Sequence, residues 1–124
     1  MQTVVIIGIF GALGCVTRYY LSGWTYSKLG WGFPWGTLSV NVAGAFFIGL
    51  IMELGLRNAN IPANIRIGLV TGFLGGLTTF STFSYETFKL LESGRFLVAF
   101  SNVIISVSVC LLFTWLGIVV AKIL

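Results

Sequence analysis

The stretch Gly72-Phe-Leu-Gly-Gly-Leu-Thr-Thr-Phe-Ser-Thr-Phe-Ser84 lies in the middle of an apolar segment long enough to cross a bilayer. Its three glycines are followed by a run of hydroxyl side chains, among which two phenylalanines stand three residues apart. A helix that only anchors a chain would carry Leu, Ile and Val instead. Irregular backbone at membrane depth is tolerated only where it is buried in protein or lines a wet cavity. The stretch therefore predicts a site within the membrane.

The composition around this stretch is that of an integral membrane protein. Of the 124 residues, 57% are hydrophobic and only 8% are charged, whereas soluble chains are about 25% charged. Residues 1–10 contain no basic region, so we expect no cleaved signal peptide. We expect a multi-pass protein of the cell (inner) membrane.

Metal, redox and nucleic-acid functions have little support in the sequence. The chain has no His and only two Cys, Cys15 and Cys110, and neither belongs to a CxxC or Cys/His pattern. We interpret both as small core side chains in apolar helices. The net charge of +4 is scattered rather than clustered. No nucleophile, base or metal constellation predicts an enzyme.

Four apolar stretches are each near the length that crosses roughly 30 Å of hydrocarbon at about 1.5 Å per residue. They cover about residues 3–24, 35–56, 65–91 and 96–123, with turn-forming sequences between them. The aromatic residues of an expected interfacial belt gather near the first turn: Trp24, Tyr26, Trp31 and Trp35. We expect an all-α membrane protein, a single membrane domain over residues 1–124, with its third helix broken near residues 75–79.

The positive charges give almost no preference for one orientation in the membrane. With four spans, one side carries Arg57, Arg66 and Lys122, and the other carries Arg18, Lys28, Lys89 and Arg95. Either a single residue or the insertion machinery decides the orientation, or copies insert both ways. The second alternative leads to an antiparallel homodimer, because four short helices are few for enclosing a pathway.

Small residues recur along the first two spans. They are Gly8, Gly11, Gly14 and Cys15 in the first span, and Gly44 and Ala45 in the second. In lipid, small residues let helix backbones approach closely. We interpret these positions as packing surfaces.

Polar side chains follow one face of the second and fourth spans. Thr37 and Asn41 lie four residues apart and so share a face. In the fourth span a polar stripe recurs every four residues: Asn102, Ser106, Cys110 and Thr114. A single hydroxyl in a membrane helix usually bonds its own i−4 carbonyl, but four in register, together with Asn41, favour the lining of a pathway.

The third span contains both a helix breaker and an aromatic pair. The pair Gly75-Gly76, followed by Leu77-Thr78-Thr79, can interrupt the helical hydrogen bonds. Half-helix ends in membranes bind ions, with carbonyls facing cations and N–H groups facing anions. Phe80 and Phe83 lie one turn apart, and the edge of a phenyl ring is positive. Two such edges could meet a small anion.

Few charged side chains lie within the spans. Glu86 is the deepest acid, and Lys89 at i+3 is expected to pair with it. Proton-coupled transport by a buried carboxylate therefore has little support. Arg18 either reaches back to the interface or attracts anions at a vestibule.

Three motifs together resemble the Fluc/CrcB family of fluoride channels, over essentially the whole chain. Gly14-Cys-Val-Thr-Arg18 resembles the family's GxxxR, and Gly36-Thr37-Leu-Ser-Val-Asn41 resembles its GTLxxN. The opening stretch, residues 72–84, resembles the family's signature at the third-helix break. This last motif is long and specific, whereas the first two would be weak alone.

The resemblance implies a dual-topology antiparallel homodimer that exports cytoplasmic fluoride passively through two pores. It also implies a structural sodium ion at the dimer centre, held by the backbone carbonyls of Gly75 and Thr78 from both subunits. The positions that match the pore and its vestibule are Asn41, Phe80, Phe83, Ser81, Thr82, Thr37, Ser106, Cys110, Thr114 and Arg18. Cys110 stands where we expect a hydroxyl in this family, and relatives often carry a different polar side chain at Ser106.

Two other functions remain open. A small multidrug-type dual-topology exporter would need an essential carboxylate, for which Glu86 is the only candidate. A non-transporting assembly subunit held by glycine packing would leave Asn41 and the polar stripe without a role.

Overall fold

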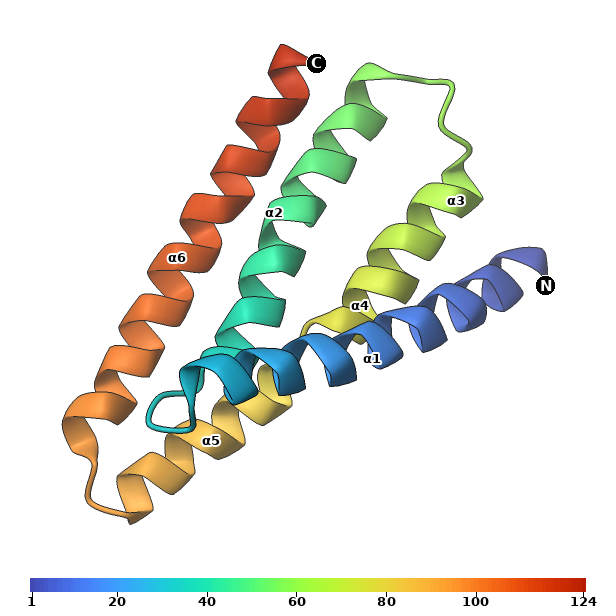
Figure 1. The fold of residues 1–124 in the computed structure, drawn as a ribbon. Helices are drawn as coiled ribbons and strands as arrows, with labels where there is room; N and C mark the ends of the chain where they lie inside the picture. Colours follow the sequence, from blue (N-terminus) through green and yellow to red (C-terminus); the bar gives the residue numbers. More distant parts are fainter.

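The computed structural model describes all 124 residues, and its regular structure is entirely helical (Figure 1). The elements are α1 (Gln2–Leu29), α2 (Trp35–Arg57), α3 (Ala63–Ile67), the π-helical segment η1 (Gly68–Leu74), α4 (Gly75–Leu77), α5 (Phe80–Glu92) and α6 (Phe96–Ile123). Four stretches are long and apolar enough to cross a membrane: Gln2–Leu29, Trp35–Arg57, Ala63–Glu92 and Phe96–Ile123. The prediction of an all-α, multi-pass membrane protein with a broken third helix is confirmed.

Helix α1 continues to Leu29, past the expected end near Trp24. Hydroxyl groups in its last turns donate hydrogen bonds to backbone carbonyls of the same helix. Thr25 Oγ1 donates to the Leu21 carbonyl at 2.8 Å, and Ser27 Oγ donates to the Trp24 carbonyl at 2.6 Å. The helix ends at Gly30, whose φ of 80° suits a residue without a side chain.

The third span is interrupted at two threonines rather than at its glycine pair. Thr78 and Thr79 have extended backbone, with ψ angles of 157° and 119°. Gly75 and Gly76 are helical. Gly76 instead permits close packing, because a Cβ there would lie 2.5 Å from the Gly11 carbonyl oxygen of α1. The break therefore falls within the expected range, and the glycine pair serves the helix before it.

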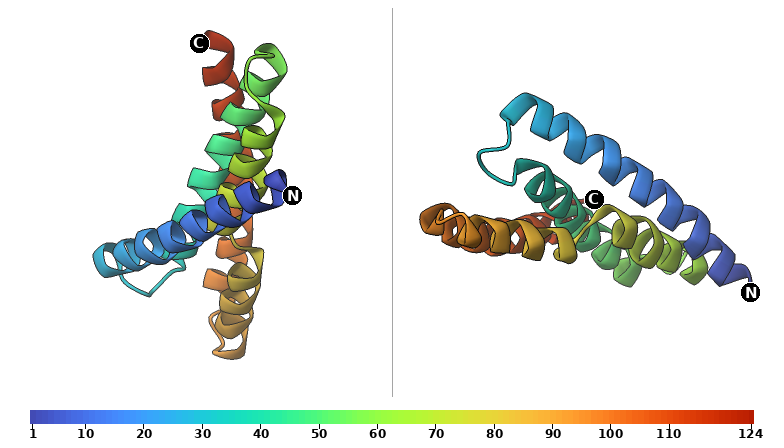
Figure 2. Two further views of the ribbon diagram at one scale, coloured as in Figure 1. Left: turned by 90° about the vertical axis from the view of Figure 1, so that its right-hand side faces the viewer. Right: turned by 90° about the horizontal axis from the view of Figure 1, so that it is seen from below.

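Helix α1 crosses obliquely over the broken span, whereas α2 and α6 run side by side (Figures 1 and 2). A Cβ on Gly14 of α1 would lie 2.1 Å from the Phe73 carbonyl oxygen in η1. Gly49 and Gly117 allow a similar approach between α2 and α6, with their Cβ positions 2.2 Å and 2.1 Å from backbone oxygens of the facing helix. Small residues thus set the helix spacing, as expected in lipid. Gly8 is an exception, because nothing lies within 4 Å of its Cβ position.

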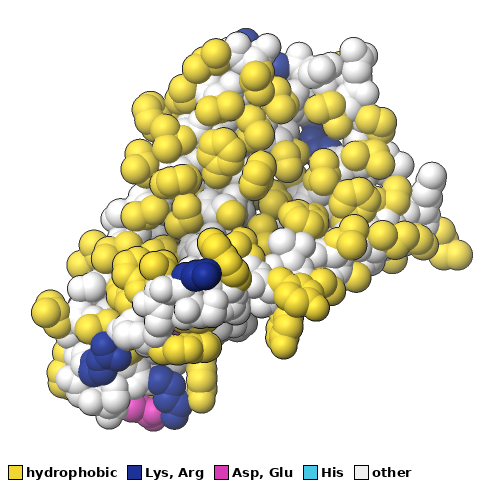
Figure 3. Space-filling model, viewed as in Figure 1, with side chains coloured by type: hydrophobic (Ala, Val, Ile, Leu, Met, Phe, Trp, Pro, Cys, Tyr) yellow, Lys and Arg dark blue, Asp and Glu magenta, His cyan; other side chains and the backbone are white.

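The two ends of the molecule are tied by arginines. Arg95 Nη2 donates to the Gly32 carbonyl at 2.6 Å, joining the α5–α6 and α1–α2 loops. At the other end, Arg57 Nη1 donates to the Ala121 carbonyl of α6 at 3.2 Å. In Figure 3 hydrophobic side chains cover much of the visible face, and the few charged side chains stand singly or in small groups, mostly near the upper and lower ends. This surface suits contact with lipid or with another apolar surface.

Candidate functional site

The break in the third span is held by Asn41 of α2. Asn41 Nδ2 donates to the Thr79 carbonyl at 3.0 Å, and Thr79 N–H donates to Asn41 Oδ1 at 2.8 Å. The side-chain amide therefore pairs with the backbone as a neighbouring strand would. Backbone groups at membrane depth need such partners, so Asn41 supports the interruption between Leu77 and Phe80.

Three hydroxyl groups gather where α5 begins. Thr79 Oγ1 caps the helix by accepting from Thr82 N–H at 3.1 Å. It also lies 3.0 Å from Thr82 Oγ1 and 3.3 Å from Ser81 Oγ. The N-terminus of a helix carries a positive partial charge. This cluster of Thr79, Ser81 and Thr82 is therefore suited to an anion.

One hollow beside the break, here called the α6 cavity, has a volume of about 480 Å³. Its walls come from α2, the break, α5 and α6, and they include Asn41, Gly75, Thr78, Thr79, Phe80, Phe83, Ser106, Cys110 and Thr114. The rings of Phe80 and Phe83 lie 5.5 Å apart at 42°. The structure thus brings most of the expected pore positions to one cavity.

The polar stripe of α6 divides into two parts. Asn102 is buried and packs against α5, where its Nδ2 donates to Thr87 Oγ1 at 2.9 Å. It also accepts from Ser106 Oγ at 3.2 Å. Ser106, Cys110 and Thr114 line the α6 cavity. The stripe therefore lines a cavity only over its last three members, while Asn102 joins two helices.

A second hollow of about 490 Å³, here called the α1 cavity, is lined by residues of α1, α2 and α5. Its polar wall comprises Arg18, Thr37, Thr79, Thr82 and Glu86, together with Ser22 and the rings of Tyr19, Tyr26 and Trp31. Thr79 lines both cavities. Arg18 lines this cavity, and its Nη1 lies 3.5 Å from the Thr78 carbonyl oxygen. Its guanidinium group brings a positive charge to the wall of the α1 cavity.

The expected ion pair between Glu86 and Lys89 is wrong. Lys89 Nζ lies 2.7 Å from Glu92 Oε2 on the exposed side of α5. Glu86 faces inward instead, where Tyr26 donates to its Oε2 at 2.5 Å and Thr37 donates to its Oε1. Both pairs are three residues apart in sequence, so only the tertiary partners of Glu86 decide between them.

The two cysteines lie in different surroundings. Cys15 is exposed rather than a core side chain, whereas Cys110 is half-buried in the α6 cavity.

Two backbone carbonyls at the break have few hydrogen-bond partners. The Gly75 carbonyl lacks the N–H group that it would accept from in a continuous helix, because Thr79 N–H donates to Asn41. The Thr78 carbonyl meets only the long Arg18 contact.

Sequence reasoning missed Thr79, Tyr26 and the position of Glu86. Thr79 had a usable signal, since Thr is one of the residues preferred at the N-cap of a helix. Tyr26 had none, because it resembles any interfacial aromatic residue.

Comparison with known proteins places these features in context. Residues 5–118 match the family described as CrcB-like protein, Camphor Resistance (CrcB). The protein named "Fluoride-specific ion channel FluC" from Geotalea uraniireducens (strain Rf4) is 65% identical over 122 residues, covering 98% of each chain. Proteins with the same name from Geotalea daltonii, at 65% identity, and Geobacter sulfurreducens, at 59%, also cover 98% of both chains.

Proposed function

The chain belongs to the CrcB family of membrane proteins, and on that premise we propose that it is a fluoride-selective channel for passive export of cytoplasmic fluoride. The observation that carries this proposal is the hydroxyl cluster of Thr79, Ser81 and Thr82 at a helix N-terminus, in which Thr79 lines both cavities and Thr82 lines the α1 cavity. The names of the close relatives supply the identity of the anion.

Hydrogen-bond donors carry the chemistry of the proposed pathway. Fluoride is small and strongly hydrated, so its dehydration must be offset by close donors. The Thr82 hydroxyl and the second N–H of the Asn41 amide do this without a fixed positive charge that would trap the ion, whereas the Thr114 hydroxyl already donates to the Cys110 carbonyl at 3.1 Å. Conduction needs binding that is strong enough to admit the ion and weak enough to release it. The positive charge of Arg18 raises the anion concentration in the α1 cavity, and in this proposal Arg18 does not contact the anion where it has lost its water.

The phenylalanine pair is proposed to select the anion. Phe80 and Phe83 line the α6 cavity, and the positive edges of their rings offer a weak field to a dehydrated anion. In the proposed dimer the rings and hydroxyls border a narrow path, and chloride is larger than fluoride. Chloride is therefore excluded by size, while fluoride exchanges one weak donor for the next.

A second copy of the chain completes the pathway in this proposal. Phe80 is 78% exposed in the single chain although it lines the cavity, and large apolar side chains are exposed along all four spans. The nearly equal positive charges on the two sides favour insertion of copies in both directions. An antiparallel homodimer would close the α6 cavity of each copy and give two pores.

A sodium ion at the dimer centre fits the residues at the break. Hard cations prefer oxygen ligands, and the Gly75 carbonyl is left without its helical N–H partner. The Thr78 carbonyl is contacted by Arg18 at 3.5 Å and keeps a second lone pair. Four such carbonyls from two copies would hold the ion, which would supply a fixed positive charge that joins the two breaks. The residues of this chain provide the ligands and the close packing around them.

The physiological direction follows from the chemistry of the ion. Hydrogen fluoride enters cells as a neutral weak acid and dissociates inside. A membrane potential that is negative inside then drives the anion outward, so a passive pore is sufficient. The relatives described above are named ion channels, which gives no support to the multidrug-type exporter.

Reconstitution into liposomes tests the proposal. Vesicles loaded with potassium fluoride and treated with valinomycin should release fluoride rapidly when they contain the protein, as measured by a fluoride electrode. Vesicles loaded with potassium chloride serve as the matched control and should retain chloride. Equal release of the two anions, or no release of fluoride, contradicts the proposal.

A further inference from the structure

Glu86 accepts hydrogen bonds from two other helices, and it is the only acid of the chain that does so. Tyr26 at the end of α1 donates to Oε2 at 2.5 Å, and Thr37 at the start of α2 donates to Oε1. The two hydroxyl oxygens are themselves 3.4 Å apart. Both oxygens of the carboxylate are therefore occupied, and the cluster joins α1, α2 and α5.

Tyr26 is fixed on two sides. Its ring stacks on Trp31 of the α1–α2 loop, with the ring centres 3.8 Å apart and the planes 3° from parallel. It also lies against Gly36, where a Cβ would come within 2.2 Å of the ring. The side chain is 7% exposed. Trp31 and the backbone of α2 therefore hold the phenol in one orientation, which lowers the entropy cost of its bond to Glu86.

No lysine or arginine forms an ion pair with Glu86, so its carboxylate depends on the hydroxyl groups of Tyr26 and Thr37. The single ion pair in the chain joins Lys89 to Glu92, and Arg18 turns toward the Thr78 carbonyl. The Tyr26 bond is also the only hydrogen bond between α1 and α5. Glu86 nevertheless lines the α1 cavity beside Thr82. Without Tyr26, one carboxylate oxygen would be free to take a hydroxyl donor such as Thr82 and to place its charge in the cavity.

We propose that Tyr26 is a positioning residue, which holds the Glu86 carboxylate against Thr37 and so keeps it away from the donors that an anion needs. Trp31 contributes by keeping the phenol ring in place. This inference rests on the proposed function for its effect on fluoride, but the position of Glu86 is testable without any ion.

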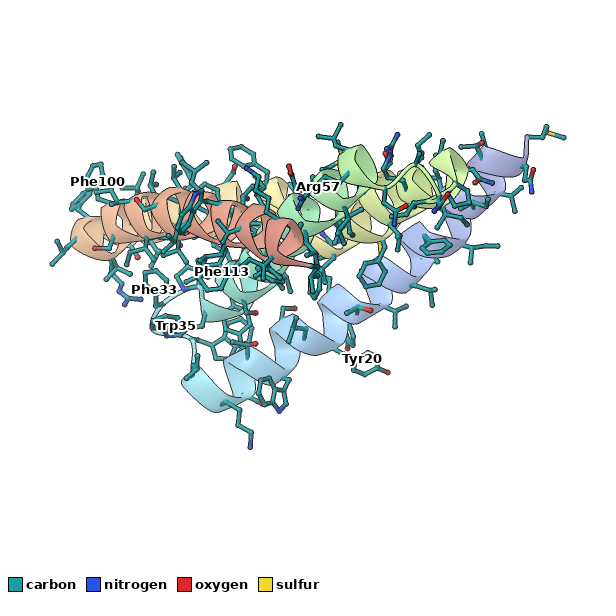
Figure 4. All side chains as sticks on the ribbon, turned by 90° about the horizontal axis from the view of Figure 1, so that it is seen from above. Tyr20, Phe33, Trp35, Arg57, Phe100 and Phe113 are labelled. Atoms are coloured by element: carbon teal, nitrogen blue, oxygen red, sulfur yellow. The ribbon has the colours of Figure 1, made fainter.

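The first experiment measures that position directly. Dicyclohexylcarbodiimide adds to a carboxyl group in apolar surroundings and leaves a stable N-acylurea, and mass spectrometry locates the adduct. Tyr26→Phe should raise labelling of Glu86 relative to Glu53 by roughly tenfold, as expected when a carboxylate loses one charge-assisted hydrogen bond. Trp31→Ala should give a smaller rise. Tyr20→Phe is the matched control, because Tyr20 is 70% exposed and points away from the bundle (Figure 4). Equal labelling of Glu86 in the wild type, Tyr26→Phe and Trp31→Ala overturns the proposal.

The second experiment asks whether Tyr26 acts through Glu86. Tyr26→Phe should lower fluoride efflux from liposomes by roughly tenfold, since one charge-assisted bond is lost. In the Glu86→Ala background the same change should have no further effect. An equal fall in both backgrounds would show a merely structural role and overturns the inference. A wild-type protein that carries no fluoride refutes the proposed function instead, and the labelling result then still decides the position of Glu86.

Discussion

At the scale of single residues, the site depends on which side chains complete the hydrogen bonds of an interrupted backbone. Asn41 gives its carbonyl and one N–H to Thr79, so only one of its donors remains for an ion. Thr79 then gives its hydroxyl to Thr82. The Thr82 hydroxyl, one of the donors offered to an anion, is thus held in place by Thr79, which does not itself need to contact the ion.

Replacing Asn41 by Ala should destabilise the protein more than it alters its surface. The Thr79 N–H and carbonyl would be left without partners in an apolar setting, which costs about 2–4 kcal/mol in total. Thermal unfolding in detergent, followed by circular dichroism, measures the effect. Asn60→Ala is the control, because Asn60 lies in an exposed loop and its side chain makes no hydrogen bond. Equal stability of the two variants would show that Asn41 does not hold the break.

The phenylalanine rings give a second prediction at this scale. Phe80→Ile and Phe83→Ile keep apolar bulk but remove the ring edge, and each should lower fluoride efflux by roughly tenfold, given the energies of aromatic contacts. Phe88→Ile is the control on the same helix, since Phe88 is 60% exposed and lines neither cavity. Unchanged efflux in the first two variants would remove the rings from the mechanism.

At the scale of elements, close approach of backbones positions the break. Helix α1 lies over η1 and α4 only because Gly14 and Gly76 carry no side chains. The π-helical segment η1 precedes the break, and such segments occur frequently at functional sites. The two cavities therefore depend on the crossing of α1 as much as on the residues that line them.

A methyl group on Gly14 should disturb this crossing. Gly14→Ala would bring a Cβ to 2.1 Å from the Phe73 carbonyl oxygen, and overpacking of this kind costs about 1–3 kcal/mol. Gly8→Ala on the same helix is the matched control, since its Cβ position is open within 4 Å. A lower unfolding temperature is expected for Gly14→Ala alone. If Gly8→Ala lowers it equally, the loss comes from the helix and not from the crossing.

The sequence predicts the spans well because bilayer thickness fixes their length, and it predicts the interruption because hydroxyls and glycines replace aliphatic residues there. It does not predict which residues leave the helix. That choice depends on Asn41, which lies far from Thr79 in the sequence. The prediction of an ion pair between Glu86 and Lys89 was wrong for the same reason, since Tyr26 and Thr37 approach Glu86 only in the folded chain.

At the scale of the whole molecule, one chain leaves its α6 cavity open and its apolar sides exposed. The positive charges are divided almost equally between the two sides. Both features fit the antiparallel pair of copies proposed above, in which each copy meets the same surface of the other.

Insertion in both directions can be measured in cells. A tag on the C-terminus should be labelled by a membrane-impermeant reagent in about half of the molecules before lysis, since the charges give neither orientation an advantage. Full labelling after lysis provides the reference. Adding lysines beside the tag should shift the molecules toward one orientation. Labelling of all or of none of the tags before lysis would contradict dual topology.

Anion selectivity is the central claim, and the zero-current potential of a planar bilayer tests it most directly. With fluoride on one side and an equal concentration of chloride, with the same cation, on the other, each tenfold preference for fluoride shifts this potential by about 59 mV. We predict a shift of more than about 100 mV, with the sign of fluoride movement, because a hundredfold preference corresponds to roughly twice that step. A zero-current potential near 0 mV, with current flowing, would show that the pathway does not distinguish the two anions and would contradict the account.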